Sequence, residues 1–154
     1  MNRRDMMALT GAAALAAAAS NGGAPQAAET ATIGARLLRL YSDAEGQSHM
    51  EELVMAGASK PIPATEIRLA TAAAGESSGE FHNSLFRRFV RNLSGEMEIT
   101  TSDGKTHRTG PGDLVFLEDI AGKGHVSVPV SAITALFIHV RDGFDVVAWA
   151  KNAG

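Results

Sequence analysis

The regular spacing of turn signals between Gly95 and His125 most strongly constrains the fold. An Asp-Gly pair at 103–104 separates two short segments of β character, as expected for a tight hairpin. A Pro-Gly-Asp turn at 111–113 then begins an apolar run, and a glycine-rich loop leads to His125. This order predicts short strands that deliver one histidine to the interior of a β-structure.

The rest of the chain, after its amino-terminal region, has the same character. Besides the hairpin, we predict strands at 35–41, 49–55, 66–72, 81–93, 114–117, 125–128, 133–140 and 144–149. No convincing helical period follows the amino-terminal region, so the crossover helices of a doubly wound α/β fold are not expected. Many short strands at regular spacing predict an all-β sandwich or barrel.

The amino terminus has the composition of an export signal. Arg3 and Arg4 precede an uncharged run of small and apolar residues from Met6 to Ala19. This run is shorter than the roughly 20 residues that span a bilayer, so we expect no permanent membrane span. The paired arginines resemble a bacterial twin-arginine signal, and an ordinary secretory signal is the alternative. We therefore predict that residues 1–28 are export signal and leader, and that the protein is periplasmic or secreted.

Residues 29–154 have the length of a single domain, so we predict one β-barrel domain there. The chain has no cysteine and must be stabilised by its core alone. Its net charge of −3, without a large basic cluster, gives no support to nucleic-acid binding. No phosphate-binding glycine loop or nucleophile elbow is present.

Three motifs in a fixed order resemble the cupin family over essentially the whole predicted domain. Residues 43–52 read Asp-Ala-Glu-Gly-Gln-Ser-His-Met-Glu-Glu, His82 is followed by Arg87 and Arg88, and residues 118–125 read Glu-Asp-Ile-Ala-Gly-Lys-Gly-His. The resemblance implies a double-stranded β-helix, or jelly-roll barrel, that holds a small organic molecule. It also implies a homodimer that pairs through barrel edges.

The resemblance also bears on metal binding. It places His82, Ser84 and Arg88 at the positions of two histidines and a glutamate in the usual cupin metal motif. A serine hydroxyl is a poor ligand and an arginine offers no lone pair, so the usual ligand set is incomplete. His82 and His125 remain the candidate ligands of a divalent metal, and the cofactor stays open. The side chains considered to complete such a set are Glu98, Asp119 and His139.

The same alignment suggests catalytic residues. It implies that His82 and His125 point into the barrel mouth, with His125 facing the rim, where imidazoles serve as acid and base groups. The alternative is that each is a hydrogen-bonded structural histidine. Arg88 shares a strand face with His82 and would project inward, paired with an anionic substrate group or with Glu98. A register slip of one residue would instead turn Arg88 outward.

Several further polar residues have interpretations that need no functional role. Glu118 and Asp119 fit either a functional rim loop or a capped turn, and turns dominate for this composition. His49 is expected near the surface and His107 is expected to be solvated. His139 lies on one face of its strand, but the sequence does not say whether that face lines the interior.

Two functions are compatible with these features. The first is an enzyme of the isomerase, lyase or oxygenase type, in which His82 and His125 act as acid and base and Arg88 holds an anionic group. The second is a non-catalytic cupin, either structural or binding a small ligand, that has lost its metal site. The substituted ligand positions favour the second, and the histidine pair favours the first. A protein interaction module has little support, because no large exposed apolar stripe is evident.

Overall fold

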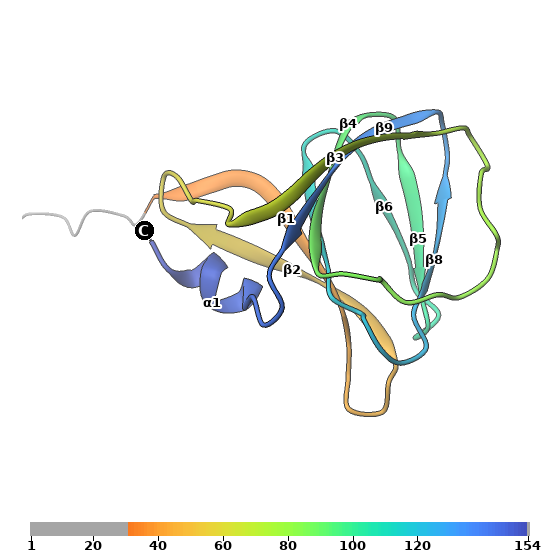
Figure 1. Ribbon diagram of the computed structural model, residues 1–154, viewed down its shortest axis with the longest axis horizontal. Helices are drawn as coiled ribbons and strands as arrows, with labels where there is room; N and C mark the ends of the chain where they lie inside the picture. Colours follow the sequence, from red (N-terminus) through yellow and green to blue (C-terminus); the bar gives the residue numbers. More distant parts are fainter. Residues whose placement is uncertain (1–30, 154) are drawn as a thin grey trace, which may run out of the picture.

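The computed structural model describes residues 31–153, which form two β-sheets and one short helix. The predicted export signal, residues 1–28, lies outside the described residues. Figure 1 shows the sheets grouped together and the helix α1 set to one side of them. The prediction of an all-β fold is therefore confirmed.

The larger sheet has six strands in the order β2-β1-β7-β4-β9-β3, and the smaller has three in the order β6-β5-β8. The strands of the larger sheet are β1 (Thr32–Ser42), β2 (Ser48–Ala56), β3 (Ala64–Ala72), β4 (Arg88–Ser94), β7 (Asp113–Leu117) and β9 (Ile133–Val140). The smaller sheet contains β5 (Met97–Thr101), β6 (Thr106–Thr109) and β8 (His125–Pro129). All pairs are antiparallel except β1 with β7.

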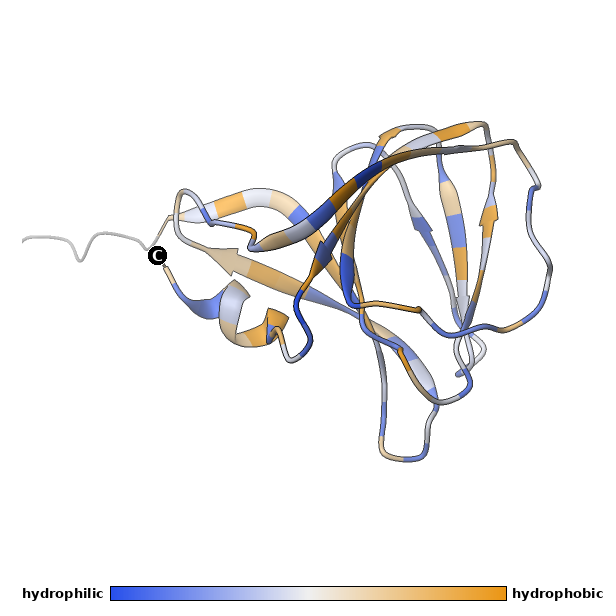
Figure 2. Ribbon diagram, in the orientation of Figure 1, coloured by the Kyte–Doolittle hydropathy of each residue, from blue (hydrophilic) through white to orange (hydrophobic). Residues whose placement is uncertain are grey.

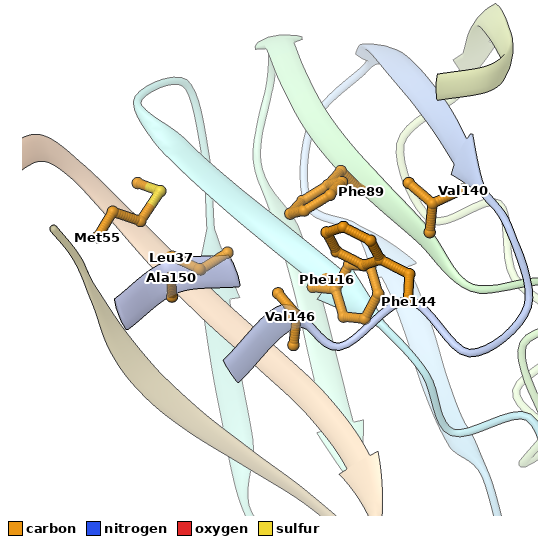
Figure 3. Close-up of a cluster of buried hydrophobic side chains, with 8 residues drawn as sticks. All are labelled: Leu37, Met55, Phe89, Phe116, Val140, Phe144, Val146 and Ala150. Atoms are coloured by element: carbon orange, nitrogen blue, oxygen red, sulfur yellow. The ribbon is translucent and has the colours of Figure 1, made fainter. Parts of the chain in front are cut away.

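Away from its edge strand β3, the larger sheet buries apolar residues on both faces, and a different part of the chain covers each face. On the inner face, Leu40 and Val115 pack with Ile99 of the smaller sheet. On the outer face, Phe89 and Phe116 pack with residues of the carboxyl-terminal segment (Figure 3). Hydrophobic and hydrophilic residues alternate along several strands in Figure 2. Successive side chains of a strand point to opposite faces of the sheet, which produces this alternation.

The strand predicted at 144–149 is wrong, because this segment forms the helix α1 (Val146–Lys151). The Asp145 side chain accepts a hydrogen bond from the Ala148 amide and caps the first turn. Val146 and Ala150, one helical turn apart, are both buried against the outer face of the sheet. A six-residue element is too short for its sequence to distinguish this spacing from strand alternation.

The strand predicted at 81–93 begins only at Arg88. Of the preceding residues, His82 and Ser84 bond to the start of β8 and to the loop before it, while Arg87 still accepts a hydrogen bond from Val140 at the end of β9. His82 forms an isolated antiparallel bridge with His125, and the Ser84 amide donates to the Asp119 carbonyl. In Figure 1 the segment between β3 and β4 accordingly runs along the outside of the smaller sheet, next to β8.

Within residues 31–153, no helix has the length and apolar character needed to cross a membrane.

Candidate functional site

A cavity of about 180 Å³ lies between the two sheets. His82, Arg88 and His125, which we singled out from the sequence, all line it. Its other walls are mostly apolar and are formed by Val90, Asn92, Met97, Ile99, Thr109, Val115, Leu117, Ser127 and Phe137. The structure thus brings the three predicted residues to one site, while their chemical roles stay a prediction.

A chain of hydrogen bonds runs from Ser84 through Asp119 to His125 at this site. The Ser84 hydroxyl donates to Oδ1 of Asp119 at 2.7 Å, and Nδ1 of His125 lies 2.6 Å from Oδ2 of the same carboxylate. All three side chains are buried, and Asp119 is 0% exposed. A carboxylate that accepts the Nδ1 proton fixes the ring orientation and tautomer, so Nε2 is the nitrogen available to a ligand.

The expected rim position of His125 is wrong. The residue is only 3% exposed, at the first position of β8 and paired with Thr101 of β5. Its burial follows from the bridge to His82, which closes the segment before β4 over this end of the smaller sheet. A substitution of His125 therefore disturbs the packed interior.

The second imidazole, His82, lies at the exposed side of the cavity. Its ring centroid is 4.8 Å from that of His125, and its backbone exchanges two hydrogen bonds with His125 of 3.0 and 2.9 Å. Gly124 makes this close approach feasible, because a Cβ there would lie 2.2 Å from the His82 carbonyl oxygen. The glycine also has a φ of +73°, which L side chains rarely adopt.

Arg88 lines the cavity, which is the inward one of the two orientations that the sequence left open. Among the described residues, its Nε atom is buried without a hydrogen-bond partner, and its guanidinium lies 4.9 Å from the centre of the Phe137 ring. Burial lowers the pKa of Arg88, and the negative charge of Asp119 offsets this only in part. Of the two partners considered for Arg88, Glu98 is not the one present, because that carboxylate is half exposed and lies 3.4 Å from Arg108.

The side chains considered as further metal ligands are not brought to the histidine pair as a set. Glu98 faces away from the cavity, and Asp119 is hydrogen-bonded to Nδ1 of His125. His139 lines a second cleft, where its ring centroid lies 5.2 Å from that of Phe86. Residues 31–153 contain no grouping of three His, Cys, Asp or Glu side chains that could bind a metal ion.

Of the two interpretations left open for Glu118 and Asp119, the capped turn does not account for the contacts of their side chains. Glu118 forms an ion pair with Arg39, and Asp119 is the buried acceptor described above. The sequence indicates Ser84 only as a substituted ligand position and does not reveal that its hydroxyl donates to Asp119. A serine two residues after His82 gives no signal of this contact, because its partner is 35 positions away in the chain.

The remaining histidines occupy different environments. His49 is partly exposed, as expected, and its two ring nitrogens contact Asp43 at 2.6 Å and Asp103 at 3.1 Å. His107 was expected to be solvated, but its Nε2 atom is buried without a partner in the described part of the chain. Burial lowers the pKa of His107. Neither residue lines the cavity.

No known protein family matches the chain, and no curated protein matches it either. One similar solved structure is that of a conserved protein of unknown function from Streptococcus pyogenes, with 27% sequence identity and a TM-score of 0.41. The match covers 51% of this chain. It spans 65% of the streptococcal chain, which is just under two thirds of that protein's length.

Proposed function

We propose that this protein is a cupin-like exported protein that binds a small organic anion between its sheets and catalyses proton transfer on it. The observation that carries this proposal is the buried chain Ser84–Asp119–His125 beside an arginine without an acidic partner. The order of sequence motifs supports the cupin assignment, and two facing sheets are compatible with it.

His125 is suited to act as a general base. Imidazole is the side chain that exchanges protons near neutral pH, and a carboxylate on Nδ1 stabilises the imidazolium that forms when Nε2 takes a proton. The Asp119 carboxylate lies at Nδ1 of His125 and is itself held by the Ser84 hydroxyl. In the proposed step, a C–H bond next to a carbonyl group breaks, its proton moves to Nε2 of His125, and the electron pair remains on the substrate as an enolate.

Arg88 supplies the positive charge for the anion. A half-buried guanidinium is costly unless it is paired, and no described carboxylate lies within ion-pair distance of it. A carboxylate can accept two parallel hydrogen bonds from a guanidinium, which also fixes its orientation. His82, beside His125, would donate a proton of its own to a different atom in an isomerase or to the leaving group in a lyase, and proton exchange with solvent would then restore both imidazoles.

A metal-dependent oxygenase is a poorer fit to these residues. Ser84 donates to Asp119 and Arg88 is a cation, so neither can serve at the ligand positions that the cupin resemblance assigns to them. The same substitutions favour the second candidate function, a cupin that binds a small anion without catalysis. The homodimer implied by the resemblance likewise stays a proposal, which light scattering on the purified protein tests.

Binding and exchange measured together test the proposal. We would titrate the wild-type protein with a panel of 2-oxo and 3-oxo carboxylates and follow deuterium uptake from D2O by NMR. We expect binding to require Arg88, and the His125→Gln variant to bind but not to exchange. His107→Gln is the control, because His107 does not line the cavity. Binding without exchange would favour the non-catalytic function, and binding that survives Arg88→Gln would contradict the proposed anion site.

A further inference from the structure

A second and wider cleft, of about 850 Å³, adjoins the inner cavity. Arg88 and Phe137 line both spaces, so the two meet at this pair of side chains. The cleft is formed by β3, by the end of β9 and by the segment just before β4. A ligand held at Arg88 can therefore extend from one space into the other.

The wall of this outer cleft carries unusually exposed apolar side chains. Leu85 is 81% exposed, Leu69 is 67% exposed and Phe86 is 53% exposed, and all three line the cleft. Large apolar groups that stand together in a surface depression mark a binding site more often than isolated exposed ones do.

The charged side chains of the cleft favour a ligand with an anionic head group. Glu66 and Arg68 form an ion pair with each other, so their charges are already compensated. Arg88 is the cleft arginine for which the described residues provide no ion pair, and its buried Nε has no acceptor. An anion at the junction of the two spaces would compensate it without disturbing the other pair.

The size of the inner cavity limits what it can hold. Its volume of about 180 Å³ is below the roughly 300–1,000 Å³ of pockets that enclose a whole drug-sized ligand. The short reacting end of a ligand fits there. Any larger part of the ligand has to lie in the outer cleft.

We propose that the ligand is an amphipathic carboxylate whose apolar body lies in the outer cleft against Leu85, Phe86 and Leu69. Its carboxylate binds Arg88, and its short reacting end enters the inner cavity beside His125. This inference rests on the proposed function, because both use Arg88 as the site of the anion. It adds that the apolar body determines which carboxylates bind well.

A homologous series of ligands tests the apolar subsite. Straight-chain monocarboxylates from butanoate to octanoate are titrated into the full mature protein by calorimetry. Burial of one methylene group can raise the binding affinity up to about fourfold. We therefore expect the affinity of the wild-type protein to increase two- to fourfold with each added carbon. The gain per carbon should fall in Leu85→Ser and in Phe86→Ser. Hexan-1-ol, which lacks the charge, should bind at least tenfold more weakly than hexanoate.

Val54→Ser is the matched control, because Val54 is 73% exposed and does not line the cleft. It should keep the wild-type gain per carbon. Arg88→Gln should weaken every member of the series by a similar factor while keeping the gain per carbon, since it removes only the head-group contact. Circular dichroism checks that each variant is folded.

The outcomes separate the two proposals. If short carboxylates bind in an Arg88-dependent way but affinity does not grow with chain length, the outer subsite is wrong and the inner anion site stands. An unchanged gain per carbon in both serine variants would also overturn the outer subsite. If no carboxylate of any length binds, the proposed anion site itself is wrong and the inference falls with it.

Discussion

Nδ1 of His125 lies 2.6 Å from Oδ2 of Asp119, and both side chains are withdrawn from solvent in the interior of the protein. The two residues are only six positions apart, with Asp119 in a loop for which the sequence favours an ordinary turn and His125 at the start of β8. Burial makes this contact important, because a carboxylate removed from water needs donors on its oxygens. The Ser84 hydroxyl and the His125 ring supply them.

The first prediction concerns this buried carboxylate. Asp119→Ala leaves the Ser84 hydroxyl and Nδ1 of His125 buried without a partner, which should lower the free energy of unfolding by about 2–4 kcal/mol. Urea denaturation measures the change. Asp142→Ala, at an exposed position, should change it by no more than about 0.5 kcal/mol. A loss below about 1 kcal/mol in Asp119→Ala would show that the hydrogen-bond chain is not important for stability.

The second prediction concerns the contact between Gly124 and His82. Gly124→Ala should cost more than about 3 kcal/mol, because it adds a clash with the His82 carbonyl to the strain of a positive φ. Gly104→Ala is the control, since Gly104 has a φ of +85° but open space around it. It should cost only about 1–2 kcal/mol. Equal losses in thermal denaturation would mean that the close approach of the two segments does not matter.

The third prediction concerns His49, which joins the turn after β1 to the turn between β5 and β6. The hydrogen bond with Asp43 raises the pKa of His49, and Asp103 adds to this, while burial opposes it. Because the folded-state pKa of His49 is raised, its ion pairs stabilise the protein fully at pH values below the unfolded-state pKa of about 6.5. This stabilisation is lost as the pH rises through the folded-state pKa.

The melting temperature of the wild-type protein should therefore exceed that of His49→Gln most at pH 5.5, and the difference should shrink by pH 9. The partner carboxylates remain charged over this range. The pKa of Asp103 is lowered to about 2 by hydrogen bonds from Thr101, Lys105 and His49, although burial opposes this. A melting-temperature difference that grows from pH 5.5 to pH 9 would contradict the ion-pair interpretation.

The fourth prediction concerns export and falls on residues outside the described part of the chain. Replacement of both Arg3 and Arg4 by lysine should abolish periplasmic accumulation, because a twin-arginine signal requires the pair. Cell fractionation followed by immunoblotting measures it. Unchanged accumulation would favour the ordinary secretory signal, which needs only a positive charge at this end.

The sequence by itself determined where the chain turns, because turn chemistry is local. The Asp-Gly pair at 103–104 and the Pro-Gly-Asp turn at 111–113 mark the ends of β5, β6 and β7 as the structure has them. The alternation of residues in β9 was also evident, but it left open which face of that strand is inside. Pairing with β4 decides this, since His139 lies opposite Arg88 and shares its face.

Only the tertiary structure decided what is buried and what it contacts. Asp119 is a turn residue by composition, and it becomes a buried acceptor because the segment containing His82 and Ser84 folds over it. Residues 146–151 become a helix because Phe89 and Phe116 offer an apolar surface that a short amphipathic turn can cover. The backbone preference of a few residues is set by neighbours in sequence, whereas the environment of a side chain is set by segments that are distant along the chain and meet only in the folded protein.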